Sequence, residues 1–248
     1  MSTAVRQLRD AYDPFALIYN RGMAEDFCRR AWPIVEKLLL SRLPKQARIL
    51  DLCCGSGQIA RELSERGYRV TGLDGSTAMI TIAQQNAPQA NFILADARSF
   101  SLAPTFDGII SSFNSLAHAA TLDELAAILS NANHALKPNG TLLFDLSMEE
   151  AYTSKWRGSF GDAHSDAAWI VRPSYDRDSR TATNAVTIFH RNNTAWHRSD
   201  LTIHQHCFSE DEIRHALELA RFTHIDSFDA ERDLGMNGET GRRFFLSA

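Results

Sequence analysis

Short apolar runs alternate with stretches of helical period along the first part of the 248-residue chain. A run that is apolar at nearly every position is typical of a strand buried on both faces of a sheet. Between the runs, apolar residues recur three and four positions apart, as in an amphipathic helix. Strand and helix in alternation predict an α/β fold with a doubly wound, mostly parallel sheet. We expect the first five strands at Ile49–Cys53, in the apolar run that ends at Asp74, and at Asn91–Ala95, Phe106–Ser111 and Thr141–Leu146.

Capping residues and prolines predict where the helices begin and end. Ser76 or Thr77 is expected to cap a helix that runs to about Ala87. Thr121 and Glu124 form the sequence of a capping box, and the helix after it is expected to end in a turn at residues 137–140. Between residues 24 and 41, Pro33 predicts either two short helices or one kinked helix.

The pattern changes after residue 150. Three strand-like runs, Ala168–Arg172, Asn184–Arg191 and Asp200–Phe208, follow one another with polar turns between them. Because no helical stretch separates them, they are expected to pair as an antiparallel meander. A second capping box, Ser209 with Glu212, then starts a helix. Strands near 223–228 and 243–246 complete the expected seven-stranded sheet.

Composition narrows the classes of protein. No apolar run is long enough to span a bilayer and no signal peptide opens the chain, so we expect a soluble, cytoplasmic protein. The 26 basic and 30 acidic residues give a net charge of −4 with no basic block, which makes nucleic acid an unlikely partner. The four cysteines form no C-x-x-C pair, and His204 with His206 lacks a third ligand, so no metal site is expected. Composition leaves the oligomeric state open, with a homodimer as one option.

The stretch from Arg48 to Asp74 predicts a βαβ unit that holds a nucleotide. Gly55 and Gly57 allow a sharp turn after the first strand and a close approach of a ligand to the backbone. The helix that follows directs its free N–H groups toward the same place. Asp74 ends the second strand, where it is positioned to accept hydrogen bonds from ribose hydroxyls. An ordinary turn that uses two glycines is the plainer alternative.

Two residues disfavour a dinucleotide in this unit. Ala60 stands where a dinucleotide fingerprint has its third glycine. Asp51 would repel a pyrophosphate but suits a cationic amino-acid ligand. The sequence D-L-C-C-G-S-G resembles the first motif of class I S-adenosylmethionine-dependent methyltransferases, and L-D-G-S-T-A-M-I resembles their next segment. The chain departs from the commoner spelling at Cys53, Cys54 and Gly75.

This resemblance implies a binding site for S-adenosylmethionine, with S-adenosylhomocysteine as product. In the family, an N-terminal element folds over the cofactor. The resemblance implies that Tyr12 and Tyr19 border the cofactor and that Arg21 pairs with the carboxylate of the cofactor. Tyrosines at these positions are also typical of a hydrophobic core. Asp96 would bind the adenine amine and the Ala97 N–H a ring nitrogen. The other residues expected at the cofactor are Asp51, Cys53, Gly55, Ser56, Gly57, Asp74, Gly75, Met79, Ser112 and Phe113.

The segment after the fourth strand is expected to lie beside the reacting methyl group. Asn114 is a candidate for the wall of the site around this methyl group. His118 is a candidate for the catalytic residue, because some related sugar-amine N-methyltransferases carry a histidine here. A loop histidine is also often a capping or solvated residue. The predicted meander resembles the lid of the small-molecule and sugar-amine N-methyltransferases. Further candidates on the substrate side are Trp169, His204 and His206, with Tyr152 and Trp156 as apolar walls.

The sequence therefore predicts one methyltransferase domain with four parts. They are an N-terminal helical cover (1–45), a cofactor-binding core (46–150), an inserted β lid (151–208) and a C-terminal helix with closing strands (209–248). The predicted activity is methyl transfer to an amine or hydroxyl of a small molecule, which would be the partner. Two alternatives stay open: a methyltransferase-like module that binds without catalysis, and an NAD(P)-dependent oxidoreductase, although no Tyr-x-x-x-Lys set is present.

Overall fold

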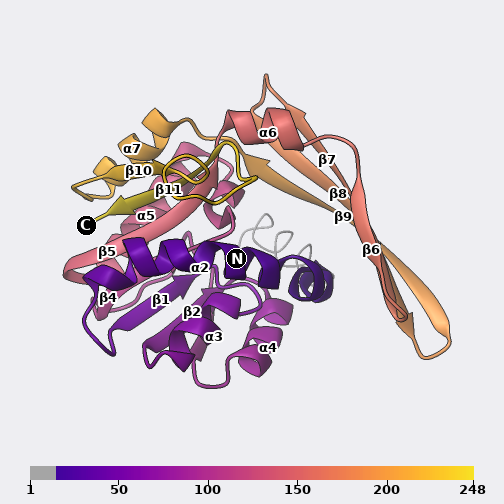
Figure 1. Ribbon diagram of the computed structural model, residues 1–248, viewed down its shortest axis with the longest axis horizontal. Helices are drawn as coiled ribbons and strands as arrows, with labels where there is room; N and C mark the ends of the chain where they lie inside the picture. Colours follow the sequence, from indigo (N-terminus) through magenta and orange to yellow (C-terminus); the bar gives the residue numbers. More distant parts are fainter. Residues whose placement is uncertain (1–14) are drawn as a thin grey trace.

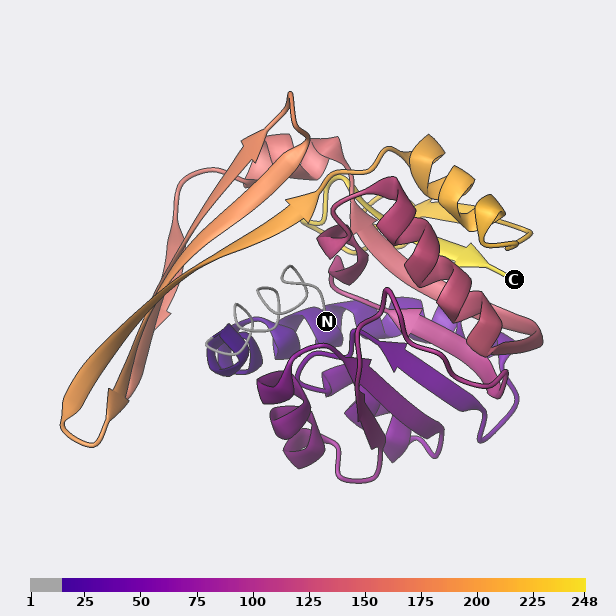
Figure 2. The ribbon, with the colours of Figure 1, turned by 180° about the vertical axis from the view of Figure 1, so that it is seen from behind.

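The computed structural model describes residues 15–248 and shows a twisted sheet with helices on both faces and a long β arm at one side (Figures 1 and 2). Residues 15–22 are helical. The remaining elements follow in this order: α2 (Ala24–Leu38), η1 (Leu40–Arg42), β1 (Arg48–Leu52), α3 (Gln58–Glu65), β2 (Arg69–Asp74), α4 (Thr77–Asn86), β3 (Asn91–Leu94), β4 (Phe106–Ser111), η2 (Ser115–His118), α5 (Leu122–Ala135), β5 (Leu136–Ser147), α6 (Glu149–Lys155), β6 (Phe160–Ala163), β7 (Ala167–Asp176), β8 (Thr181–Asn192), β9 (Ala195–His206), α7 (Glu210–Leu219), β10 (Asp226–Asp229) and β11 (Arg242–Ser247).

The main sheet has seven strands in the order β10-β11-β5-β4-β1-β2-β3. All neighbours pair in parallel except β11, which is antiparallel to β10 and β5. This confirms the predicted doubly wound, mostly parallel sheet. The strand order reverses between β1 and β4, and open α/β sheets bind ligands at such a point.

Alternating residues of the buried strands serve two hydrophobic cores. Ile49 of β1 packs with α2 and α3 on one face, whereas Leu50 packs with α5 and α7 on the other. Both side chains are completely buried. Because successive side chains of a strand point to opposite faces, this two-sided burial explains the uninterrupted apolar runs in the sequence.

The four-stranded antiparallel sheet β6-β7-β8-β9, which we call the lid, is separate from the main sheet. Its inner part packs on helix 15–22 and α4 through a third apolar cluster, which includes Phe15, Met79 and Trp169. Its outer part extends away from the body of the protein (Figure 2). The predicted meander is confirmed, but β6 was missed because this short strand is exposed at every position. The predicted runs were also shorter than β7, β8 and β9.

Three local predictions are corrected or refined. The region around Pro33 forms one helix, α2. Residues 137–140 lie within β5 as an irregularity, because Leu136 pairs with Phe106 but Thr141 pairs with Gly108. The first capping box is only half formed: Thr121 Oγ1 accepts the Glu124 N–H, but the Glu124 carboxylate accepts the Ala120 N–H instead. In the part of the chain described, no helix is long and apolar enough to cross a membrane.

The capping box of α7 is complete and gives a prediction about stability. Ser209 Oγ accepts the Glu212 N–H at 3.2 Å, and the Glu212 carboxylate accepts the Ser209 N–H at 2.8 Å. We expect Ser209→Ala to lower the free energy of unfolding by about 1 kcal/mol, because a helix N–H loses its acceptor. Urea denaturation measures this change. Ser179→Ala in the exposed β7–β8 turn is the control, and equal stability of the two variants would contradict the prediction.

Candidate active site

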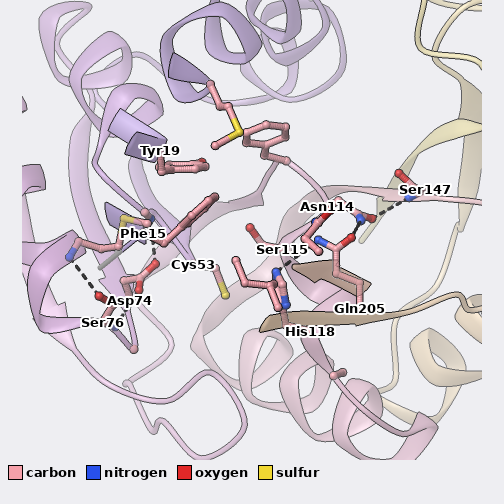
Figure 3. A pocket seen from close by; sticks show the side chains of 18 of the residues that line it. Phe15, Tyr19, Cys53, Asp74, Ser76, Asn114, Ser115, His118, Ser147 and Gln205 are labelled. Carbon is pink, nitrogen blue, oxygen red and sulfur yellow. Dashed lines mark hydrogen bonds between the residues drawn. The ribbon is translucent and has the colours of Figure 1, made fainter. Parts of the chain in front are cut away.

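A cavity of about 410 Å³ lies where the strands of the main sheet end, and the lid covers it. Residues just after or at the carboxyl ends of five parallel strands line it: Gly55, Gly75, Ala97, Phe113 and Ser147. The lid contributes residues from all four of its strands: Phe160, Pro173, Asn184, Ile203 and Gln205. The cavity is therefore built from both sheets. Figure 3 shows Asp74 and Ser76 at one end of it and Asn114, His118 and Gln205 at the other.

The carboxylate of Asp74 braces the turns that follow β1 and β2. It accepts the Gly55 N–H on one oxygen and the Ser76 N–H on the other, both at 2.9 Å. Gly55 has a φ of +52°, and a Cβ there would lie 3.0 Å from the ring of Tyr19, so only glycine fits without strain. At Gly75 a Cβ would meet no atom closer than 3.8 Å, so the chain leaves open space beside Asp74.

Asp96 lies at the same end of the cavity and is paired with Arg98. Their shortest contact is 2.8 Å, and both side chains line the cavity. Asp96 accepts three hydrogen bonds from Arg98, one from its backbone N–H and two from its guanidinium. Met79, Cys53 and Tyr19 supply less polar wall nearby. One end of the cavity thus combines two carboxylates with apolar surface.

A buried carboxylate, Asp145, shapes the opposite end. It accepts the backbone N–H groups of Phe113 at 2.7 Å and Asn114 at 3.0 Å, and it forms an ion pair with Arg242 of β11. Phe113 and Asn114 both have positive φ values, 63° and 61°, which are uncommon outside glycine. The Asp145 carboxylate therefore stabilises the turn that directs η2 and His118 into the cavity.

Asn114 joins three further elements through its side chain. Its Oδ1 accepts the Ser147 N–H at 2.8 Å, and its Nδ2 donates to Tyr152 at 2.9 Å and to Gln205 at 3.0 Å. Asn114 is 5% exposed, so these bonds satisfy a polar group that would be costly to bury alone. The carboxamide is therefore a fixed part of the cavity wall.

His118 lies between this carboxamide network and the lid. Its Nδ1 is 2.9 Å from the carbonyl oxygen of His204, and its Nε2 is 3.4 Å from Gln205 Nε2. Burial lowers the pKa of His118 to about 4, against a smaller opposite effect of the His204 carbonyl. The imidazole is therefore neutral near pH 7 and can accept a proton.

The structure brings twelve of the predicted site residues to this cavity. They are Tyr19, Cys53, Gly55, Asp74, Gly75, Met79, Asp96, Ala97, Phe113, Asn114, His118 and Trp156. Tyr12 lies outside the described residues. That each of the twelve contacts cofactor or substrate stays a prediction.

Four other predicted residues have partners away from the cavity. The guanidinium of Arg21 forms two hydrogen bonds with Asp166, at 2.9 and 3.1 Å, so its fork is occupied. Trp169 is 4% exposed and packs against Gly22, where a Cβ would lie 2.7 Å from its ring. The ring of His204 contacts Thr183, and the ring of His206 contacts Phe208. Successive side chains of β9 point to opposite faces of the lid. Gln205 faces the cavity, so His204 and His206 on either side of it share the opposite face.

The remaining candidates do not line the cavity. Ser56 is completely buried and donates to Gln58 at 2.8 Å, and Gly57 is the N-cap of α3 with a φ of +84°. Ser112 also lies outside the cavity lining. Asp51 is 2% exposed, and its Oδ2 has no hydrogen-bond partner among the described residues.

Several residues of the cavity were not predicted from the sequence. Gln205, Asn184 and Phe160 come from the lid, and Lys155 and Glu239 also line the cavity. Asp145 lies within an apolar strand, and a charged residue at such a position was a usable signal. For the lid residues, the usable signal was the alternation of side chains along a strand. Once one residue of a strand is known to face the cavity, the residues two positions away are expected to face it as well.

Comparison with known proteins gives the family. Residues 49–140 match a family described as methyltransferase domain. The chain is 29% identical to YqeM of Bacillus subtilis, named as a methyltransferase, over 216 residues, which cover 85% of this chain and 86% of that one. It is an S-adenosylmethionine-dependent class I methyltransferase.

Two further comparisons agree with this. A dTDP-3-amino-3,4,6-trideoxy-alpha-D-glucopyranose N,N-dimethyltransferase of Streptomyces venezuelae is 30% identical over 172 residues, 69% of this chain and 65% of that one. The crystal structure of an S-adenosylmethionine-dependent methyltransferase from Clostridium acetobutylicum superposes with a TM-score of 0.78 at 19% identity, over 95% of this chain and 98% of that one. The latter confirms the fold. The methyltransferase family replaces the oxidoreductase alternative.

The end of the cavity around Asp74 fits S-adenosylmethionine. The carboxylates of Asp74 and Asp96 match the hydroxyl and amine donors of an adenosine, and the space beside Gly75 lies between these two strand ends. Gly55 allows close approach to the backbone at the turn. These groups are the ones that would hold the cofactor.

We expect Asp74→Ala to weaken the binding of S-adenosylhomocysteine by about 1–3 kcal/mol, because charge-assisted hydrogen bonds to the ribose and to the two turns are lost. Isothermal titration calorimetry measures the affinity. Asp178→Ala, in an exposed turn of the lid, is the matched control. An unchanged affinity in Asp74→Ala would show that the ribose lies elsewhere.

Asp51 gives a pH-dependent prediction. Burial, and secondly the charge of Asp74, raise the pKa of Asp51 from 3.8 to about 7. The folded protein therefore binds this proton more tightly than the unfolded chain, so the contribution of Asp51 to stability falls as the pH rises from about 4 to about 7. Asp51→Asn should be more stable than the native protein at about pH 8, and this difference should shrink toward about pH 4.

Urea denaturation of the cofactor-free protein across this pH range checks the Asp51 prediction. The exposed Asp226→Asn is the control for a general effect of removing one negative charge. A difference between Asp51→Asn and the native protein that does not depend on pH would contradict it.

Proposed function

We propose that this methyltransferase transfers a methyl group to an amine nitrogen or a hydroxyl oxygen of a small polar molecule. The observation that supports this most is the neutral imidazole of His118, which lines the cavity between its cofactor end and the lid. A group that can take a proton is useful for acceptors that lose one on methylation.

Bound S-adenosylmethionine supplies a methyl group that is already electrophilic, because it is carried by a sulfonium. The chain therefore has to align the acceptor, exclude water and remove a proton. Alignment alone can contribute about 7–11 kcal/mol to lowering the barrier. The lid suits this task, since Ile203 and Phe160 close the cavity with apolar surface while Gln205 and Asn184 offer polar groups to an acceptor.

His118 has the properties of the proton acceptor in this reaction. An attacking amine must be neutral, and it gives up a proton once its nitrogen carries the methyl group; a hydroxyl gives up its proton as the bond forms. In both cases Nε2 of His118 takes the proton, because Nδ1 is bound to the His204 carbonyl. A pKa of about 4 keeps this ring unprotonated at neutral pH and makes it a weaker base than a free imidazole.

The nature of the acceptor is supported by the cavity and by one relative. The walls away from Asp74 include Asn114, Lys155, Gln205 and Glu239, which suit a hydrophilic molecule rather than a lipid. The Streptomyces venezuelae relative is named for N-methylation of a nucleotide-linked amino sugar. Amino sugars and other small amines are therefore the first acceptors to test.

A panel of amines, amino sugars and phenols, incubated with the protein and S-adenosylmethionine, tests the proposal by mass spectrometry. The proposal predicts a product one methyl group heavier than its acceptor for at least one amine or hydroxyl compound. Transfer confined to carboxylic acids, which need no base at neutral pH, would contradict it.

We expect His118→Ala to lower the turnover of such an acceptor by about 10²- to 10⁴-fold and to leave the affinity for S-adenosylhomocysteine unchanged. Turnover follows from product formation at saturating cofactor, and affinity from calorimetry. His215→Ala, an exposed histidine of α7, is the matched control and should behave as the native protein. Normal turnover in His118→Ala would exclude a role for His118 in the reaction.

A further inference from the structure

The hydrogen bonds around His118 form a chain whose direction is fixed at both ends by the backbone. At one end the Ser147 N–H, which can only donate, lies 2.8 Å from Asn114 Oδ1. At the other end the His204 carbonyl, which can only accept, lies 2.9 Å from His118 Nδ1. These two contacts assign the orientation of the Asn114 amide and place a proton on His118 Nδ1.

The interior of the chain follows from these ends. Since Asn114 uses its oxygen for Ser147, its Nδ2 must donate, and it does so to Gln205 Oε1 at 3.0 Å. Gln205 therefore presents its carbonyl oxygen to Asn114 and its NH₂ group to His118. This NH₂ group lies 3.4 Å from His118 Nε2, which with its proton on the other nitrogen is an acceptor. Each of these donors thus meets an acceptor. Figure 3 shows the part of the chain that runs from Ser147 through Asn114 and Gln205 to His118.

We propose that Gln205 is a positioning residue for His118. Held by Asn114, it keeps the imidazole in the orientation in which Nδ1 donates to the His204 carbonyl and Nε2 lies beside the Gln205 amide. This inference rests on the proposed function, because it concerns the residue assigned as proton acceptor. Gln205 and the His204 carbonyl belong to one strand, β9, so the lid itself sets the state of His118.

The geometry also explains how an acceptor gains access to Nε2. The contact between Gln205 and His118, at 3.4 Å, is long for an N–H···N bond and is the weakest link of the chain. An amine or hydroxyl donor in the cavity can replace it without disturbing the shorter bonds on either side. Gln205 is then left with an N–H group beside the acceptor, and its carbonyl stays bound to Asn114.

Nitrogen NMR of the histidine rings tests the proposal independently of activity. Protein labelled with ¹⁵N-histidine distinguishes a protonated from an unprotonated ring nitrogen, and His118→Asn assigns the signals of residue 118. In the native protein at pH 7 we expect a protonated Nδ1 and an unprotonated Nε2. A native spectrum with the proton on Nε2 would overturn the proposal.

The decisive variant is Gln205→Glu. A carboxylate can still accept from Asn114, but its second oxygen faces His118 Nε2 and favours a proton there. We expect both ring nitrogens of His118 to be protonated at pH 7 and turnover to fall at least about tenfold, with the affinity for S-adenosylhomocysteine unchanged. An unprotonated Nε2 in folded Gln205→Glu would overturn the proposal.

Two further variants separate positioning from a general effect on folding. Gln205→Met has a similar length but no hydrogen bonds; it should keep the proton on Nδ1, because the His204 carbonyl remains, and lose less turnover than Gln205→Glu. Thr202→Ala, on the outward face of the same strand, should match the native protein in spectrum and turnover.

If Gln205→Glu does not fold, the native spectrum and the loss of turnover in Gln205→Met decide the matter. Native turnover in folded Gln205→Met would overturn the proposal. If no amine or hydroxyl compound accepts a methyl group, the proposed function is refuted. The hydrogen-bonded arrangement of Asn114, Gln205 and His118 would still be supported if the spectrum shows the predicted tautomer.

Discussion

The buried carboxylate of Asp145 holds together the parts of the chain that meet at the acceptor end of the cavity. Its oxygens accept two consecutive backbone N–H groups after β4 and pair with Arg242 of β11. The two residues that donate, Phe113 and Asn114, have positive φ values that few other sequences would adopt without such support. Removing one partner of a buried ion pair typically costs about 3–5 kcal/mol. The position of Asn114, and through it that of Gln205 and His118, depends on this one interaction.

A second constraint places the lid over the cavity. Trp169 of the lid packs so closely on Gly22 that no larger residue fits there, and Arg21 beside it is bonded to Asp166. The lid is therefore fixed to helix 15–22, which borders the cofactor end through Tyr19. In this way one N-terminal helix links the Asp74 end of the cavity to the lid. Only the inner half of the lid takes part, since the outer half extends away from the protein (Figure 1).

Local chemistry made much of the Asp74 end of the cavity predictable from sequence. Gly55, Asp74 and Asp96 each follow or end a strand whose apolar pattern was plain, and parallel strands bring such residues to one edge of the sheet. The substrate end was harder, because its residues meet only through tertiary packing. Arg21 was expected at the cofactor, but the lid supplies a carboxylate that occupies it. The inward-facing residue of the H-Q-H stretch in β9 is Gln205, and sequence alone gives the alternation of a strand but not which of its faces is buried.

In the proposed reaction, one cavity holds the cofactor at Asp74 and presents its methyl group to the side where His118 and Gln205 lie. The decisive experiment is a crystal structure of the protein with S-adenosylhomocysteine. We expect ribose hydroxyls within hydrogen-bond distance of Asp74, adenine beside Asp96, and the sulfur facing Asn114 and His118. An adenosine bound outside this cavity, or a sulfur turned away from His118, would contradict it.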